Sequence, residues 1–474
     1  MSQRSASAVV KGTVPAVVLL LVSGQCAAFD WGLRARGGFV HSDNVSQAPA
    51  PLDDAASIGT LELTGTLQHA TRSLSVDAEA NHIYRYFFDN QYDAESQSQL
   101  RAALDWSPLR DLLHISLTDT YGQLALNPAE GLLPSQYENA NVFTAGPTVM
   151  LPVTIDTRFS ARGEYRTANY QDSPLDTERK LGEVRLEHDL SRLISLYGSG
   201  TTSRVDYDIS GSTGGYDLNS VEAGLNAVGR RTSLGLTAGM DRLRQDGRTF
   251  DGTTFQFDLE RRMSSSRRLF LSARREITDA ADVFSLGQIS DPALSGIRDV
   301  QVTPQPLLRS QYRLGYVWTG NHLDVALLAG YITEEFEALP QDPSVPAGED
   351  RNVREASIDA NYRFTASTSL GGSVQVLRER FDSGLSSDDL LTTVTYAQNV
   401  ASNLALELRA QHIKRDNSPR NFNELRAFVY VSYTFREIAG RAPSVFDRAF
   451  ERRTQRIRGS ADRPRPEVPG TDDP

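Results

Sequence analysis

The sequence predicts an all-β protein: a transmembrane antiparallel β-barrel of about 20 strands (roughly 18 to 22), with short periplasmic turns and long extracellular loops. Three observations predict this fold. Apolar and polar residues alternate along most of the 474-residue chain, the N-terminus has the pattern of a secretion signal, and short connections alternate with long ones. Beyond the N-terminus, no apolar run is long enough for a spanning helix.

Residues 1–28 have the composition of a secretory signal peptide. Two basic residues precede the apolar run Val14–Val22, and small residues suit cleavage after Ala28. A lipoprotein anchor at Cys26 is the alternative, although the bulky Gln25 before it argues against this. Cys26 is the one cysteine of the chain. The mature chain should therefore contain no disulfide, even though it enters an oxidising compartment.

The predicted barrel covers residues 29–435. Its first strand follows Trp31, and the second, near Ser57–His69, places leucines on one face and Glu, Thr and Gln on the other. Similar alternating segments follow near residues 74–80, 100–106, 113–117, 138–151, 153–166, 177–190, 194–207, 218–228, 233–244, 253–263 and 269–278. The last seven lie near 307–318, 323–336, 354–364, 369–381, 390–398, 404–414 and 425–435.

The last of these segments has the pattern of an assembly signal. Its alternate residues Val429, Val431, Tyr433 and Phe435 are apolar and end in an aromatic pair. Outer-membrane barrels end in this way, so we expect the barrel-assembly machinery and outer-membrane lipid to be partners. The expected location is the outer membrane of a Gram-negative bacterium.

The connections between the predicted strands supply an independent check. Tight turns, as at Ala70–Ser73 and Thr319–His322, alternate strictly with longer polar loops, as at Leu126–Tyr137 and Leu339–Val353. This alternation is expected when one end of a barrel faces the periplasm and the other faces the exterior. A soluble all-β protein is the alternative, but it does not need the secretion signal, the loop alternation and the Phe-terminated strand together.

Three short segments carry a family resemblance: FVHSDNVS (Phe39–Ser46), NVFTAGPTVML (Asn141–Leu151) and the closing YVSYTF. With them the chain resembles a family of outer-membrane β-barrel porins found with exopolysaccharide synthesis and export systems, including the barrel protein associated with PEP-CTERM sorting. The resemblance implies a role in polysaccharide secretion and supplies no catalytic residues. One departure is that this chain continues past the terminal Phe435 to Pro474.

About twenty strands should enclose a water-filled lumen. The possible pore-lining residues are Arg158, Arg162, Arg166, Arg309, Arg313, Arg363 and Arg409, which are interspersed with acids on the same predicted face. Two alternatives stay open for these arginines. They form ladders that bind the carboxylates of an acidic sugar polymer, or they pair with acids on neighbouring strands and hold the wall rigid. The loop 280–306 either folds inward as a constriction or lies on the surface.

No catalytic pattern is present. The seven histidines have no metal-ligand spacing, so we expect no enzyme activity, no metal and no cofactor. The formal charge of −11 gives no reason to expect nucleic-acid binding. Two functions remain: a porin-like pore serving exopolysaccharide export, with the polymer and periplasmic export proteins as partners, or a non-transporting barrel that anchors or scaffolds the envelope. A general diffusion porin is a third possibility.

Residues 436–474 form a predicted periplasmic tail. A short amphipathic helix is expected from Pro443, with Phe446, Phe450 and Ile457 on one side, and the segment after Gly459 should be disordered. The tail could dock on an export partner, plug the pore from below, or only solvate the terminus.

Overall fold

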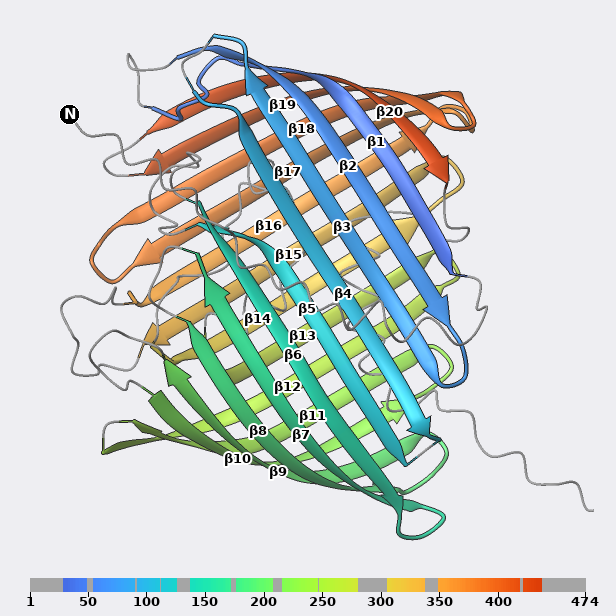
Figure 1. The fold of residues 1–474 in the computed structure, drawn as a ribbon, viewed down its shortest axis with the longest axis vertical. Coiled ribbons are helices and arrows are strands. Elements are labelled where there is room, and N and C mark those ends of the chain that lie inside the picture. The colour runs from blue at the N-terminus through green and yellow to red at the C-terminus, as the bar shows by residue number, and fades with distance from the viewer. Residues whose placement is uncertain are drawn as a thin grey trace, which may run out of the picture.

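The computed structural model is a closed antiparallel β-barrel of 20 strands, as the sequence predicts (Figure 1). It describes residues 29–48, 54–89, 92–110, 112–125, 137–171, 176–207, 215–245, 247–279, 305–336, 348–417 and 421–436. The predicted signal peptide, nearly all of the 280–306 loop and the tail after Arg436 lie outside the described residues.

The strands follow one another around the barrel in chain order. The first ten are β1 (Asp30–Ser42), β2 (Ala56–Ala70), β3 (Leu74–Phe87), β4 (Glu95–Leu109), β5 (Leu113–Ala125), β6 (Tyr137–Pro152), β7 (Thr157–Tyr170), β8 (Thr177–Asp189), β9 (Ile194–Tyr207) and β10 (Gly215–Val228). The second ten are β11 (Thr232–Gln245), β12 (Arg248–Ser264), β13 (Arg267–Thr278), β14 (Leu307–Thr319), β15 (Leu323–Phe336), β16 (Arg351–Arg363), β17 (Thr368–Phe381), β18 (Ser386–Ala401), β19 (Leu404–Asn417) and β20 (Phe422–Arg436).

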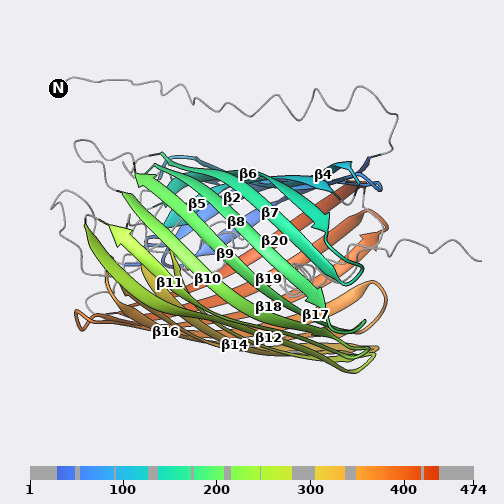
Figure 2. The same cartoon turned by 90° about the horizontal axis from the view of Figure 1, so that it is seen from below.

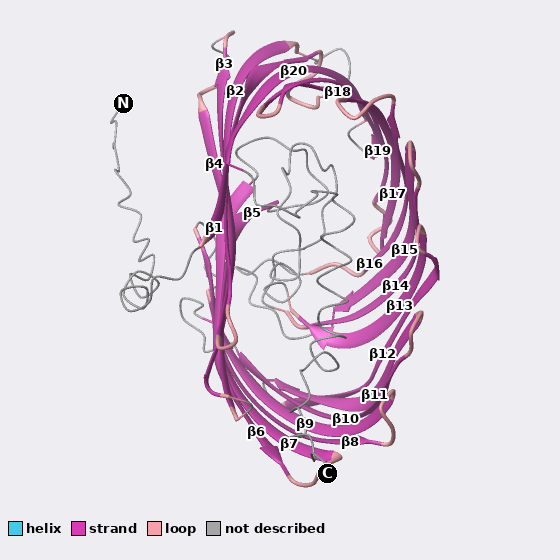
Figure 3. Ribbon diagram, turned by 90° about the vertical axis from the view of Figure 1, so that its right-hand side faces the viewer, coloured by secondary structure: helices cyan, strands magenta, loops and turns pink. Residues whose placement is uncertain are grey.

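Every strand pairs antiparallel with its sequence neighbour, and β1 pairs with β20 to close the ring. The strands are steeply tilted relative to the barrel axis, and the cross-section of the barrel is a flattened oval (Figures 2 and 3). They are 12 to 17 residues long, whereas about ten tilted residues cross the hydrocarbon core. The strands therefore extend beyond the membrane.

Side-chain exposure alternates in the sense expected for a membrane barrel. On β20 the apolar residues Val429 and Val431 face outward and are each 49% exposed, whereas Phe428 and Tyr430 face inward and are buried. The inward aromatic pair explains why the polar side of this strand is interrupted in the sequence. A continuous apolar outer face is stable only in lipid.

Outward aromatic side chains gather towards both ends of the strands. Those nearer the short turns are Trp31, Trp106, Tyr362, Phe364, Tyr433 and Phe435. Those nearer the longer connections are Phe39, Tyr86, Phe88, Tyr165, Tyr312 and Tyr331. Two aromatic girdles flanking an apolar band are typical of barrels in the bacterial outer membrane. The chain is an outer-membrane β-barrel of a Gram-negative bacterium. Among the described residues, no helix is both long and apolar enough to cross a membrane.

The prediction that short and long connections alternate strictly is wrong at two places. On the side of the longer loops, β11 and β12 are joined by a two-residue turn, because Gln245 pairs directly with Arg248. Four residues join β17 to β18 on the same side. Each turn contains a glycine in the left-handed region, Gly247 at φ 76° and Gly384 at φ 88°, where a side chain would be strained. The sequence patterns near 253–263 and 390–398 begin too late to reveal these hairpins.

A second difference lies after β6. The expected strand at 153–166 begins only at Thr157, and the residues before it form a turn in which Val153 and Ile155 are 59% and 100% exposed. Their apolar alternation continues the strand pattern, but they lie beyond the membrane band at the turn end.

Candidate functional site: the inner wall of the barrel

The inner wall carries the charged residues predicted to line a pore. Strand registers place all seven predicted arginines on the face opposite the apolar outer face. Nine acids that the sequence pattern assigns to the lumen also lie on this face: Glu62, Asp77, Glu79, Glu183, Glu187, Asp258, Glu260, Asp359 and Glu407. A shift of one residue in any strand would have moved its charges into lipid.

Each of the seven arginines contacts a carboxylate. Four reach across strands: Arg158 to Glu187 and Asp189 at 3.3 and 3.1 Å, Arg309 to Glu334 at 3.4 Å, Arg313 to Glu355 at 2.9 Å, and Arg363 to Asp324 at 3.2 Å. Three contact an acid two residues away on their own strand: Arg162 and Arg166 both contact Glu164, and Arg409 lies 2.5 Å from Glu407.

These contacts correspond to the pairing alternative rather than to a free arginine ladder. A guanidinium that already shares a carboxylate must give up that contact before it can bind the carboxylate of a polymer. Cross-strand pairs such as Arg363 with Asp324 also hold neighbouring strands in register. The arginines therefore form a hydrophilic but internally neutralised wall.

The inner wall becomes more tightly packed from the turn end towards the loop end. On β16 the exposed fraction of the side chain falls from 41% at Arg363, to 9% at Glu355, to 1% at Arg351. The same direction holds on β19, where it falls from 19% at Arg409 to 4% at Arg415. Water thus reaches the wall mainly from the end that carries the short turns.

A fully buried charge cluster lies at the loop end of β14–β17. The Arg351 guanidinium donates to Glu334 on β15 at 2.7 Å and to Glu379 on β17 at 3.1 Å, and Arg309 contacts the other oxygen of Glu334. Buried apolar side chains, Ile332, Val353 and Leu377, pack next to it. Burying these ions costs desolvation free energy, which their mutual pairing must offset.

A second buried group joins β8, β10 and the end of β13. Arg179 donates to the Tyr216 hydroxyl at 2.9 Å and contacts Asp279, and the same hydroxyl donates to Asp279 at 2.9 Å. Asp279 lies 100 residues from Arg179 in the chain. The first residue after β13 is therefore anchored to β8 and β10 of the same part of the wall, just before the long 280–306 connection.

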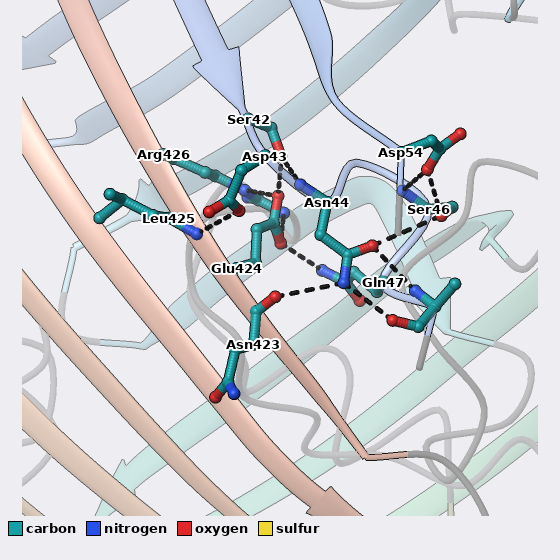
Figure 4. Close-up of polar contacts among 11 residues, drawn as sticks. Ser42, Asp43, Asn44, Ser46, Gln47, Asp54, Asn423, Glu424, Leu425 and Arg426 are labelled. Carbon is teal, nitrogen blue, oxygen red and sulfur yellow. Dashed lines mark hydrogen bonds and ion pairs between the residues drawn. The ribbon is translucent and has the colours of Figure 1, made fainter. Parts of the chain in front are cut away.

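The first and last strands are locked together at the loop end (Figure 4). The Glu424 carboxylate of β20 accepts hydrogen bonds from Ser42 at 2.6 Å, from Gln47 at 3.2 Å and from Arg426 at 2.5 and 2.8 Å. Gln47 adopts a positive φ of 53° to reach it. The Glu424 side chain is almost completely buried. The hydrogen bonds from Ser42, Gln47 and Arg426 therefore neutralise a carboxylate inside the seam.

The Asp-Asn pair of the FVHSDNVS segment completes this seam. The Asp43 carboxylate accepts the Leu425 amide at 2.7 Å, and the Asn44 side chain donates to the Asn423 carbonyl at 3.2 Å. Asn44 also bonds both the amide and the carbonyl of Ala48, which folds the start of the β1–β2 connection over the seam. This segment therefore has a structural role in closing the barrel.

Some inner carboxylates have no basic partner. Within the described part of the chain, Glu183, Glu222 and Asp359 form no ion pair, although all three face the lumen. The charge left over after pairing is therefore negative rather than positive. Among the described residues, no group of His, Cys, Asp or Glu is arranged to hold a metal ion.

Sequence reasoning missed the buried arginines of the wall at the loop end, namely Arg179, Arg351 and Arg415. Each lies on the inner parity of its strand, so the alternation could have identified them. Their burial could not be read from the sequence, because it depends on which residues lie beside them at the loop end.

Comparison with known proteins gives fold likenesses only. No family model and no curated protein matches the chain. Among solved structures, it is similar to the FrpB iron transporter from Neisseria meningitidis, at 10% identity and a TM-score of 0.46, over 86% of this chain and 82% of that one. It is also similar to the siderophore receptor PirA from Pseudomonas aeruginosa, at 10% identity and a TM-score of 0.41, over 87% of this chain and 81% of that one. The siderophore receptor PiuA from Acinetobacter baumannii is similar at 9% identity and a TM-score of 0.41, over 86% of this chain and 82% of that one.

Proposed function

We propose that the barrel is a pore for hydrated polar solutes across the outer membrane, rather than an enzyme. The observation that carries this proposal is the inner wall, where the seven predicted arginines are all neutralised by acids at the wall itself. Such a surface offers hydrogen bonds to water and hydroxyl groups without strongly retaining a charged solute. A closed barrel whose role is only mechanical has no need for a hydrophilic interior of this extent.

The proposed solute is a sugar polymer of the exopolysaccharide type, uncharged rather than acidic. An acidic polymer would meet paired arginines and the unpaired carboxylates Glu183, Glu222 and Asp359, which repel it. A neutral polymer meets hydroxyl, amide and guanidinium donors that it can exchange for water. This specificity agrees with the resemblance of the FVHSDNVS and closing segments to exopolysaccharide-associated porins, and periplasmic export proteins are the partners that it requires.

The proposed gate lies at the loop end. The wall is closely packed there around Arg351 and Glu424, whereas Arg158 and Arg363 near the turns are about 40% exposed. A solute would enter from the periplasmic end and pass the packed end only after it opens. Single-channel recording in planar bilayers tests this proposal: rare or small openings of wild type should become larger when Arg351 is replaced by Gln.

A non-transporting scaffold is the second candidate, and the tight packing at the loop end favours it. In that case the buried groups around Arg179, Arg351 and Glu424 would serve only to fill and stiffen the barrel. A folded barrel that stays silent both as wild type and as Arg351→Gln would support the scaffold and contradict the pore.

A further inference from the structure

The outer face of β16 and β17 carries three arginines at the edge of the apolar band. On β16, the outward side chain that follows Ile358 and Ala356 towards the loop end is Arg354. On β17, the side chains that follow Val374 and Val376 are Arg378 and then Arg380. All three are exposed. Each strand therefore changes from apolar to cationic at the depth where hydrocarbon meets headgroups.

The strand register brings two like charges directly opposite each other. Arg354 pairs in register with Arg378, so the two guanidinium groups project from neighbouring positions on the same surface. Like charges placed opposite each other across strands destabilise a sheet. A position of this kind is expected where an anion from outside the chain lies between the two groups.

Within the described part of the chain, these three arginines share contacts with a single carboxylate. Asp388 on β18 contacts Arg378 at 2.8 Å and Arg380 at 3.1 Å. Three arginines and one aspartate leave a net charge of +2, and Arg354 contacts no carboxylate in the described part of the chain. Five further acids lie at this end of β15–β19, but none forms an ion pair with the three arginines within the described part of the chain: Glu335, Glu349, Asp350, Asp382 and Asp416. Asp416 pairs with Lys414 instead.

The aromatic girdle adjoins this cluster and sets its depth. Tyr331 on β15 pairs in register with Arg354, whose guanidinium carbon lies 6.0 Å from the Tyr331 ring centroid. The Tyr331 hydroxyl donates to Asn352 at 3.0 Å. Tyrosines at this level occupy the interface between acyl chains and headgroups, so the arginines beside it lie at phosphate depth.

Outward basic residues at the loop end of another part of the barrel are paired with acids. On β8–β11, Lys180, Arg204 and Arg242 each form an ion pair, with Glu178, Asp206 and Asp251. Arg354 differs from them because it faces another arginine across the strands and forms no ion pair among the described residues.

We propose that Arg354, Arg378 and Arg380 bind the phosphate groups of a phosphorylated glycolipid in the outer leaflet. Arginine binds phosphate through paired, charge-assisted N–H donors. The three guanidinium groups lie just above the apolar residues Ala356 and Val376, against which the acyl chains of the same lipid would pack. Lipid binding here would relieve the repulsion between Arg354 and Arg378.

The test compares lipid retention by purified, refolded barrels. Wild type, the triple variant Arg354→Gln/Arg378→Gln/Arg380→Gln and the control Arg204→Gln/Arg242→Gln are placed in phosphatidylcholine nanodiscs with diphosphorylated lipid A. Bound glycolipid is then counted by native mass spectrometry. The triple variant should bind the glycolipid at least about tenfold more weakly, because it loses all three cationic partners of the phosphate groups. The control should equal wild type.

Two further arms keep the proposal falsifiable. Asp388→Asn removes the competing carboxylate and should strengthen binding, which tests the site even if the triple variant folds poorly. Dephosphorylated lipid A should not be retained, and inorganic phosphate at the same concentration should not compete. Equal retention by wild type and the triple variant, retention without phosphate groups, or displacement by inorganic phosphate would each overturn the proposal.

Discussion

Arg36 on β1 stacks over the ring of Tyr430 on β20, with its guanidinium carbon 3.7 Å from the ring centroid. The same guanidinium contacts Glu62 on β2 and Glu407 on β19, each at 3.2 Å. One side chain thus ties together four strands on both sides of the place where the chain closes on itself. A barrel has no free edge only if this pairing of first and last strands holds.

Replacing Arg36 by Lys should weaken this seam. Lysine keeps the charge but loses the planar stacking on Tyr430 and one of the two carboxylate contacts, which we expect to cost about 1 kcal/mol. Urea unfolding of the refolded barrel in detergent measures the effect. Arg34→Lys is the matched control, because the Arg34 side chain is 44% exposed and its ion pair with Glu62 is long at 3.9 Å. Equal unfolding midpoints for both variants would contradict the bridging role.

The aromatic end of β20 should be required for assembly. Tyr433 and Phe435 form an edge-to-face pair on the outer face, with ring centroids 4.8 Å apart. Changing both to Ala should leave the chain unassembled in the periplasm, whereas Trp106→Ala, in the same girdle on β4, should still assemble. Heat-modifiable migration on gels reports closure. Normal outer-membrane levels of the double variant would show that these residues do not act as an assembly signal.

The two ends of the barrel should differ in their access from outside the cell. Ser383 lies in the tight β17–β18 turn on the loop side, and Ser265 lies in the tight β12–β13 turn on the other side. Because both turns are short and exposed, a difference in labelling would report which side of the membrane each turn faces, and not a difference in loop length. A cysteine at 383, but not at 265, should react with an impermeant thiol reagent on whole cells. Labelling at 265 alone would mean that the orientation is inverted.

Replacing Arg351 by Met should cost about 3–5 kcal/mol of unfolding free energy, since it leaves Glu334 and Glu379 buried without their shared cation. Arg158→Met is the control, because Arg158 is 40% exposed and an exposed pair contributes about 1 kcal/mol or less. Thermal unfolding followed by circular dichroism compares them. Similar losses for both variants would mean that the loop end is not packed as described.

The fold could be read from the sequence because a two-residue period directly reports which face meets lipid. The strand count, the inner position of Arg313 and Arg363, and the outward apolar side of β20 all follow from that period. The hairpin at Gly247 could not be read, because a single glycine in a left-handed conformation shortens the connection without changing the strand pattern. Pairing partners such as Arg179 and Asp279 could not be read either, since they belong to strands that are not neighbours and meet only because the sheet curves.

If the inner wall forms a passage for uncharged polar solutes, the purified barrel should carry single-channel current in a planar bilayer. With a neutral oligosaccharide of glucose on the side of the short turns, we expect discrete openings that the sugar interrupts. An acidic uronic-acid oligomer at the same concentration should interrupt them less. A folded barrel that carries no current, or one that the acidic oligomer blocks more strongly, would contradict the account.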